Sequence, residues 1–384
     1  MTETSRTTPE HSGTIWIGAG EASGDLHGAQ LLARLREQRP GLRFTGMGGP
    51  AMAEAGFEPL YSMDLISLVG ITEVLGGLRR ILRLLRGMRR KLSEVRPEAI
   101  VLIDCPDFHF RVAKIAAKLG IPVYYYISPQ VWAWRSGRVE FLKKYVRRVL
   151  CILPFEKDFY AERGMEADYV GHPLLDELPC ELLETVEPEP RRVGLLPGSR
   201  RKEVASLLPV FAETARRLAV DVPGVRFSLV RAPGMDENLL RAHWPDDLPV
   251  EVIEPRDRYA GMKRCAFVIA ASGTVTLESA LMGTPAIVAY KLSPLSFAVG
   301  RRVVNVPYVS LPNLILGKEA FPELLQDQAT PDVISARARL WLTAPGVLDA
   351  VRGEVRALRR MVGEPGAAGR AAAIILDDLA AARS

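Results

Sequence analysis

Two aspartates stand directly after one apolar segment of this chain, in the run Ile103-Asp-Cys-Pro-Asp-Phe-His109. The preceding residues 99–103 are all apolar, which is typical of a strand buried in a parallel sheet. In open α/β sheets the carboxyl ends of the strands face the ligand. Asp104 and Asp107 are therefore candidate general bases, although an aspartate at a strand end is also a common turn former.

Two later loops have the composition of a phosphate site. Leu196-Pro-Gly-Ser-Arg200 and Ser272-Gly-Thr274 each follow a predicted strand and precede a predicted helix. Small residues, backbone N–H groups and a positive helix end suit an anion, and Arg200 can neutralise a leaving diphosphate. Glu278 follows by one helical turn, where its carboxylate can accept both hydroxyls of a ribose. Helix capping alone explains a single loop of this kind, and the helix dipole alone explains Glu278, but two such loops in one domain favour an anion site. The candidate nucleotide contacts are Ser199, Ser272, Gly273, Thr274 and Glu278.

The first glycine-rich loop is Gly18-Ala-Gly-Glu-Ala-Ser-Gly-Asp25. Its spacing, G-x-G-x-x-x-G, is one residue longer than the dinucleotide fingerprint, and no acidic residue ends the next strand, which disfavours a dehydrogenase. Two interpretations remain. The loop is either a tight turn capped by Ser23 or Asp25, or a loop that contacts sugar or phosphate through Glu21 and Ser23.

Residues 65–91 combine an apolar run with a basic one. Leu65–Leu75 is strongly apolar, and Arg79–Lys91 holds seven basic residues and no acidic one. A basic amphipathic helix beside an apolar segment is typical of a membrane-surface element, whereas the alternative is a solvated charged face over a core stripe. Nucleic acid is disfavoured because the segment has no aromatic residues to stack on bases. The candidate lipid-contacting residues are Leu65, Ile66, Leu68, Val69, Arg79 and Arg83.

The amino-acid composition excludes several classes of protein. The 384 residues are 48% hydrophobic and 25% charged, and 50 Lys and Arg against 45 Asp and Glu give a net charge of +5. These values exclude fibrous and disordered classes, and the charge alone does not indicate nucleic acid. The four cysteines form no C-x-x-C pair and are expected to be reduced thiols of a cytosolic protein. The polar first dozen residues are not a signal peptide, and no apolar run is long enough to span a bilayer.

Strand–helix alternation predicts two doubly wound parallel α/β domains and a helical tail from Asp332. Residues 181–192, with two prolines and four glutamates, are predicted to be the linker between them. The predicted strands are Thr14–Gly18, Arg43–Thr45, Ala99–Asp104, Val123–Ile127, Arg148–Leu153, Asp168–Val170, Arg192–Leu196, Arg226–Val230, Val250–Ile253, Phe267–Ala270 and Ala286–Ala289.

Taken together, the motifs resemble the lipid A disaccharide synthases, a family of bacterial glycosyltransferases. The residues that carry the resemblance are Gly20–Asp25, Ile103–Phe108, Ser128-Pro-Gln-Val-Trp-Ala-Trp-Arg135, Leu153-Pro-Phe-Glu156, Gly171-His-Pro173, Leu196–Arg200, Ser272–Thr274 with Glu278, and Tyr308-Val-Ser-Leu-Pro-Asn313.

The resemblance implies a GT-B fold, in which two Rossmann-like domains face a central cleft and the last helix returns to the first domain. The implied organisation is a disordered tail over 1–12, an acceptor and membrane-facing domain over 13–180 with about 345–384, a linker over 181–192 and a UDP-sugar-binding domain over 193–344. The implied location is the cytoplasm, bound peripherally to the inner face of the cytoplasmic membrane, and the family leaves room for a homodimer.

The resemblance also implies the reaction. The donor would be UDP-2,3-diacylglucosamine, the acceptor 2,3-diacylglucosamine 1-phosphate, and the products UDP and a β-1′,6-linked disaccharide 1-phosphate. Asp107 would be the general base and Arg200 a functional arginine, while Glu98 matches a second acidic position of the family. Further UDP contacts would fall on Asn313 and Gln326.

No metal or other cofactor is expected, because the chain lacks the D-x-D pattern of metal-dependent glycosyltransferases. The expected partners are the two lipid substrates and an anionic membrane surface. The alternative activity on the same fold is that of a UDP-sugar 2-epimerase, which would not need the basic amphipathic segment.

Overall fold

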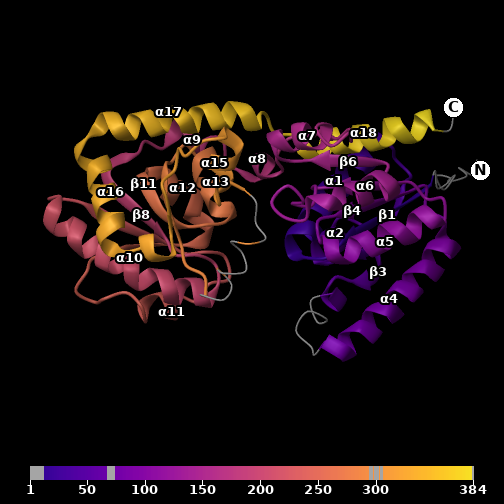
Figure 1. Ribbon diagram of the computed structural model, residues 1–384, viewed down its shortest axis with the longest axis horizontal. Coiled ribbons are helices and arrows are strands. Elements are labelled where there is room, and N and C mark those ends of the chain that lie inside the picture. Colours follow the sequence, from indigo (N-terminus) through magenta and orange to yellow (C-terminus); the bar gives the residue numbers. More distant parts are fainter. Residues whose placement is uncertain (1–12, 67–73, 294–296, 298–301, 303–305, 383–384) are drawn as a thin grey trace, which may run out of the picture. The chain divides into compact units, whose positions relative to one another are not determined.

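A computed structural model of the chain describes residues 13–66, 74–293, 297, 302 and 306–382. It divides into two compact units (Figure 1). The first comprises the described residues up to Pro173 and those from Pro365 onward, and the second runs over Leu174–Glu364. The predicted tail 1–12 lies outside the described residues.

The first unit contains a seven-stranded sheet in which all neighbouring strands are parallel. The strand order is β3-β2-β1-β4-β5-β6-β7, so the chain reverses its direction of progress between β1 and β4. Such a reversal opens a crevice at the carboxyl ends of the two strands, where ligands of this architecture bind. The strands are β1 Thr14–Ala19, β2 Arg43–Gly48, β3 Glu58–Ser62, β4 Ala99–Ile103, β5 Val123–Tyr126, β6 Arg148–Cys151 and β7 Asp168–Tyr169.

Helices cover both faces of this sheet. Ile15 and Ile17 of β1 pack into a core with α1 and α18, whereas Trp16 between them packs into the opposite core with α4 and α5. Alternate strand residues point to opposite faces, so a strand buried on both sides must be apolar throughout. The helices of this unit are α1 Ala22–Gln38, α2 Pro50–Glu54, α4 Val74–Val95, α5 Pro106–Lys118, η1 Ser136–Arg138, α6 Val139–Tyr145, α7 Pro154–Ala161 and α18 Ala367–Ala381.

The last helix, α18, belongs to the first unit although the second unit precedes it in the chain. Ala371 and Ile375 are fully buried in the core beside α1. The Tyr124 hydroxyl at β5 donates a 2.5 Å hydrogen bond to Asp378, which also pairs with Arg147. The first sheet is therefore completed by residues from the end of the chain.

The second unit contains a six-stranded parallel sheet of order β10-β9-β8-β11-β12-β13, with its own reversal between β8 and β11. The strands are β8 Glu189–Leu196, β9 Arg226–Val230, β10 Glu251–Ile253, β11 Cys265–Ala271, β12 Ala286–Tyr290 and β13 Glu323–Leu325. The helices are α8 Leu174–Glu177, α9 Leu182–Thr185, α10 Arg201–Asp221, α11 Glu237–Arg241, η2 Pro255–Asp257, α12 Arg258–Arg264, α13 Thr274–Leu281, α15 Leu311–Leu316, η3 Gln326–Gln328, α16 Pro331–Thr343 and α17 Pro345–Val362.

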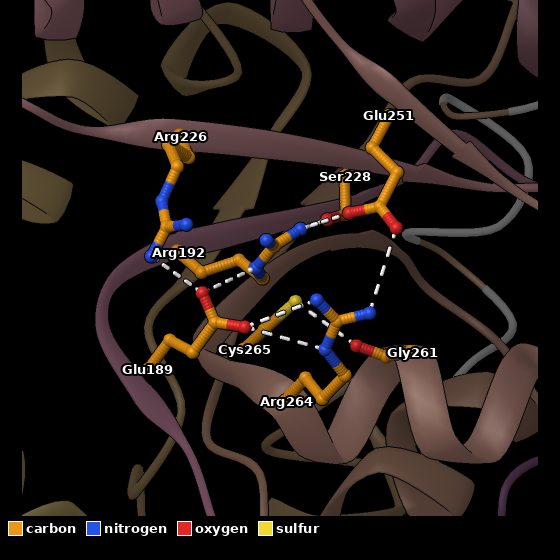
Figure 2. Close-up of polar contacts among 8 residues, drawn as sticks. All are labelled: Glu189, Arg192, Arg226, Ser228, Glu251, Gly261, Arg264 and Cys265. Atoms are coloured by element: carbon orange, nitrogen blue, oxygen red, sulfur yellow. Dashed lines mark hydrogen bonds and ion pairs between the residues drawn. The ribbon is translucent and has the colours of Figure 1, made fainter.

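A network of charges fastens the amino ends of four strands of this sheet (Figure 2). Glu189 at the start of β8 accepts hydrogen bonds from Arg192, Arg226 and Arg264, the last at 3.1 Å. Glu251 of β10 pairs with both Arg192 and Arg264. Because Arg192 is nearly buried, its charge needs these partners. The network fixes the edge of the sheet opposite the carboxyl ends of its strands.

The predicted parallel α/β architecture is confirmed, and two short strands were missed. β3 is an edge strand with mostly exposed residues and a proline at Pro59, so it lacks the apolar pattern of its neighbours. β13 has three residues. The predicted linker 181–192 lies within the second unit, because its residues 182–185 form α9 and β8 already begins at Glu189.

Candidate active site

The turn between β4 and α5 carries the two candidate bases and has an unusual backbone. Asp104 and Cys105 both have positive φ values, 48° and 47°. Each such residue costs on the order of 1–3 kcal/mol, and strain of this kind is found most often at functional sites. The Asp104 carbonyl holds the turn in place, since it accepts a 2.6 Å bond from the Tyr125 hydroxyl and lies 2.8 Å from Nδ1 of His109.

His109 is a packed residue. Its side chain is 1% exposed, and burial lowers the pKa of the ring to about 4, so the imidazole is neutral. Its Nε2 lies 3.2 Å from the position that a Cβ on Gly18 would take. The ring therefore packs closely against Gly18 of β1.

The two aspartates occupy different environments. The Asp104 carboxyl is half-buried, and burial raises its pKa. Asp107 lies in the first turn of α5, and its side chain is 70% exposed. Its carboxylate is 2.5 Å from a guanidinium nitrogen of Arg138 and 3.6 Å from one of Arg135.

The first glycine-rich loop lies directly against this turn. A Cβ on Gly20 would fall 2.7 Å from Sγ of Cys105 and 3.3 Å from Ile66, so only glycine fits there. Burial raises the pKa of the Cys105 thiol to about 11, and the nearby negative charges of Glu21 and the two aspartates add to this rise. The β1 and β4 loops thus meet at the first reversal point, with Glu21 and Ser23 exposed.

Neither of the predicted capping residues caps α1. The N-cap of this helix is Glu21, which makes no side-chain capping bond. Asp25 is 3% exposed and instead accepts backbone N–H bonds from Gly49, Ala51 and Met52. A carboxylate at the start of α2 satisfies donors that have no partner within that helix. Asp25 therefore joins α1 to the start of α2.

Glu98 lies at the wrong edge of the sheet for catalysis. It precedes β4, and its backbone N–H bonds to Thr14 at the start of β1. Its carboxylate pairs with Arg39 at 2.8 and 3.1 Å. The aspartates stand at the carboxyl end of the same strand, so the structure does not bring Glu98 together with them, and its catalytic role stays a prediction.

The basic amphipathic segment is only partly described. Leu68 and Val69 lie outside the described residues, whereas Leu65 and Ile66 are partly buried. The described residues of α4 turn an apolar stripe inward and their arginines outward. Leu85, Met88 and Leu92 are buried, and Arg79, Arg80, Arg83, Arg86, Arg89 and Arg90 are exposed. In the described part of the chain no helix is both long and apolar enough to cross a membrane.

A pocket of about 330 Å³ lies at the second reversal point, beyond the carboxyl ends of β8, β9 and β11. Most of the predicted nucleotide contacts line it. These are Ser199, Arg200, Ser272, Gly273, Thr274 and Glu278. Burial raises the pKa of the Glu278 carboxyl, and the nearby Arg258 opposes that shift.

Only one of the two predicted helix ends is available to an anion. Glu203 accepts the backbone N–H groups of Ser199 and Arg200, at 3.2 and 3.3 Å, and bonds to the Arg200 guanidinium. Its carboxylate therefore already occupies the start of α10. The first turn of α13 has no acidic residue, and Thr274 is exposed. A diphosphate in this pocket would meet the start of α13.

Sequence patterns missed three pocket residues. Arg231 follows β9, and Glu203 and Arg258 belong to helices. The Nε of Arg231 is buried without a hydrogen-bond partner in the described structure. A signal for Arg231 existed, because it follows a strand adjacent to β8 in the sheet.

Asn313 and Gln326 do not line this pocket. The buried Asn313 amide donates to Phe321 and Glu323 and accepts from the N–H groups of Ala320 and Phe321. All its hydrogen-bonding capacity is used within the protein in this structure, and the predicted UDP contact stays a prediction. Gln326 bonds through both side-chain atoms to the backbone of Leu292.

The motif Leu153-Pro-Phe-Glu156 begins α7 and contains a buried acid. Glu156 is 1% exposed and accepts the backbone N–H groups of Ile152 and Leu153 at 3.1 and 2.9 Å. Burial nevertheless raises its pKa to about 7. The Ser128 hydroxyl, in the segment after β5, lies 2.7 Å from the hydroxyl of Tyr160 in α7. The segment that follows β5 is thus anchored to α7.

Known structures with the same fold are distant in sequence. MurG of Acinetobacter baumannii superposes with a TM-score of 0.61 at 14% identity, covering 96% of this chain and 100% of that chain. A UDP-GlcNAc 2-epimerase from Neisseria meningitidis gives a TM-score of 0.56 at 11% identity, covering 95% and 98%. The fold is the predicted GT-B fold of two-domain glycosyltransferases. At these identities the likeness shows the fold alone.

Sequence comparison is more specific. A family model described as lipid-A-disaccharide synthetase matches residues 15–345. The lipid-A-disaccharide synthase of Myxococcus xanthus is 41% identical over 373 residues, which cover 94% of this chain and 97% of that protein. The protein is therefore an enzyme of the glycosyltransferase class, and its chain belongs to the lipid-A-disaccharide synthetase family.

Proposed function

We propose that the protein transfers 2,3-diacylglucosamine from its UDP derivative to the 6-hydroxyl of 2,3-diacylglucosamine 1-phosphate. The products are UDP and the β-1′,6-linked disaccharide 1-phosphate. Family membership supports the reaction type, and one observation carries the proposal for this chain. The pocket at the β8–β11 reversal combines a free helix start with a carboxylate at the distance of one helical turn.

The nucleotide side follows from that combination. The diphosphate of UDP lies at the start of α13, where the backbone N–H groups of the first turn point toward it. Glu278 on the same helix accepts the ribose hydroxyls. Arg200 and Arg231 supply positive charge to the departing UDP, which develops negative charge as its bond to the sugar breaks. Metal ions are not needed in this scheme.

The acceptor side uses the turn after β4. An α-linked donor attacked once from the opposite face gives a β product, so a single displacement is sufficient. Asp107 removes the proton of the acceptor 6-hydroxyl. A carboxylate is a weak base for an alcohol, so the proton moves late, when the bond to UDP is largely broken.

The lipid substrates require access to a bilayer. We infer that the exposed arginines of α4 and the apolar residues before it bind the surface of the anionic inner leaflet. Arg79, Arg83 and Arg86 are all exposed on the described part of α4. Such a helix binds membranes reversibly through charge and shallow apolar contacts.

One experiment tests the activity directly. Purified protein is incubated with both diacylated substrates in detergent micelles, and mass spectrometry follows UDP and the disaccharide. The expected result is equimolar formation of both products. A parallel reaction with UDP-GlcNAc alone tests the alternative, because an epimerase would convert it to the 2-epimer without an acceptor. Epimer without disaccharide would overturn the proposal.

A further inference from the structure

We propose that Arg135 and Arg138 form a binding site for the phosphate monoester of the acceptor sugar, next to Asp107. The inference rests on the proposed function, because that function supplies a phosphorylated acceptor. It assigns a role to two arginines outside the nucleotide pocket.

Two guanidinium groups converge on one carboxylate. Asp107 lies 2.5 Å from Nη2 of Arg138 and 3.6 Å from Nη1 of Arg135. Each guanidinium has five N–H donors in a fixed plane, and a single carboxylate accepts only about four hydrogen bonds in total. The pair therefore retains donors for a second anion, and its planar forks match phosphate oxygens.

Aromatic rings hold both arginines in position. The Arg135 guanidinium carbon lies 4.4 Å from the centre of the Trp134 ring, and that of Arg138 lies 5.5 Å from the same ring and 5.2 Å from Phe110. Stacking leaves the edges of a guanidinium, where its N–H groups are, open to other partners. The Arg135 side chain is 54% exposed, so a ligand can reach it.

The backbone conformation at Arg135 also supports this arrangement. Arg135 has φ 61° and ψ 44°, a left-handed conformation that residues other than glycine seldom adopt. The η1 turn follows at once and brings Arg138 to the same carboxylate, with its N–H bonded to the Arg135 carbonyl at 2.9 Å. A strained turn that places two cations beside a candidate base is consistent with a functional constraint.

The chemistry of the acceptor fits the geometry. Its 6-hydroxyl and its 1-phosphate are on the same pyranose ring, so a hydroxyl bound to Asp107 leaves the phosphate within one sugar width. The phosphate carries close to two negative charges at neutral pH and competes with Asp107 for the arginines. Drawing a guanidinium toward the phosphate frees lone pairs of Asp107, which can then accept the hydroxyl proton. Phosphate recognition therefore activates the base.

The test compares two acceptors on two proteins. The acceptors are 2,3-diacylglucosamine with and without its 1-phosphate, and the proteins are the wild type and the double variant Arg135→Gln/Arg138→Gln. For the wild type, loss of the phosphate should lower kcat/KM about 10- to 150-fold, the range for hydrogen bonds to a charged group, with part of the loss in kcat. For the double variant the two acceptors should react at similar rates.

Arg163→Gln is the matched control. Arg163 is also a partly exposed arginine of the first unit stacked on an aromatic ring, 3.8 Å from the centre of Phe159. Its substitution should leave the preference for the phosphorylated acceptor intact. If the double variant is poorly folded in thermal melts, Arg135→Lys replaces it, because this side chain is exposed. That variant keeps the charge, loses the planar fork and should show a reduced preference.

The outcomes separate the two proposals. If the wild type forms no disaccharide from either acceptor, the proposed function fails and this inference fails with it. If disaccharide forms but the double variant prefers the phosphorylated acceptor as strongly as the wild type does, only this inference is overturned. Weaker UDP binding by the double variant in calorimetry would assign the arginines to the donor diphosphate instead, which also overturns it.

Discussion

The indole Nε1–H of Trp132 donates a 3.0 Å hydrogen bond to Oε1 of Glu156. The bond joins the segment after β5, which ends at Arg135, to the start of α7. The other carboxylate oxygen of Glu156 accepts hydrogen bonds from two backbone N–H groups, so this almost fully buried acid has three hydrogen-bond donors. The segment that ends at Arg135 is thus held in place by a buried acid.

Glu156 should make stability depend on pH. Burial raises its pKa to about 7 from an ordinary value of 4.5, so the folded protein retains a proton that the unfolded chain has lost between these values. The free energy of unfolding should therefore fall as pH rises from about 4.5 to about 7. Glu156→Gln cannot titrate and should lack this slope. Its destabilisation relative to the wild type, measured by denaturant unfolding, should be greater at pH 5 than at pH 7.5. An equal difference at both pH values would contradict the prediction.

Asp107→Asn should remove the proton acceptor and keep the shape of the side chain. We expect kcat to fall by about 10²–10⁴-fold, the range for loss of a general base, with UDP affinity near normal. Steady-state kinetics and calorimetry measure the two effects. Asp104→Asn is the comparison, because this half-buried carboxyl has a raised pKa on the same turn. If Asp104→Asn is the more damaging change to kcat, Asp104 is the base.

Glu278→Gln should weaken UDP binding by about 1–3 kcal/mol, since an amide accepts hydrogen bonds from the ribose less well than a carboxylate. Isothermal titration calorimetry with UDP measures the effect. Glu237→Gln is the control, because Glu237 is an acid of the same unit that pairs with Arg241 and does not line the pocket. Unchanged UDP affinity in the Glu278 variant would limit this residue to a structural role in α13.

Reversing three exposed arginines of α4, Arg79, Arg83 and Arg86, to glutamate should abolish sedimentation with anionic vesicles. Each arginine contributes about 1 kcal/mol at such a surface, and high salt should partly release the wild type. The apparent KM for vesicle-borne acceptor should rise, whereas UDP affinity should be unchanged.

The control is a triple variant with the same change in net charge, in which Arg163, Arg337 and Arg360 are replaced by glutamate. These three residues lie outside α4. The control should still sediment with vesicles if α4 is the membrane-binding element. Equal loss in both triple variants would show that net charge alone drives the association.

Activity should survive excess EDTA. The proposed site neutralises the diphosphate with the start of α13 and with Arg200 and Arg231, so a divalent cation has no required position. Initial rates with and without chelator provide the measurement. Loss of activity that magnesium restores would mean that the diphosphate is held by another arrangement.

The fold was predictable from sequence because its central strands are buried on both faces. β4, with five apolar residues, could be recognised without any partner. β3 could not be recognised, because an edge strand needs no apolar pattern. The loops after β4, β8 and β11 were also predictable, since parallel strands bring their carboxyl ends to one edge.

Side-chain partners were not predictable in the same way. The pattern places Asp25 at the start of α1, but only the folded chain brings the N–H groups of α2 to it. Asn313 is in a family motif, and its partners at 320–323 are brought to it by the turn before β13. Glu98 is close to the aspartates in sequence, but it stands at the opposite end of β4 from them. In each case the deciding contact is between residues that no local pattern connects.

The return of α18 to the first unit has a consequence for synthesis. Domains generally fold in order as the chain leaves the ribosome, the amino-terminal one first. Here Ala371, Ile375 and Asp378 complete the core and one side of the first sheet, and they are made only after the whole second unit. The second unit is contiguous and can finish folding earlier. The first unit is therefore completed after the second, and until α18 is made its apolar surface beside α1 must be kept from other partners.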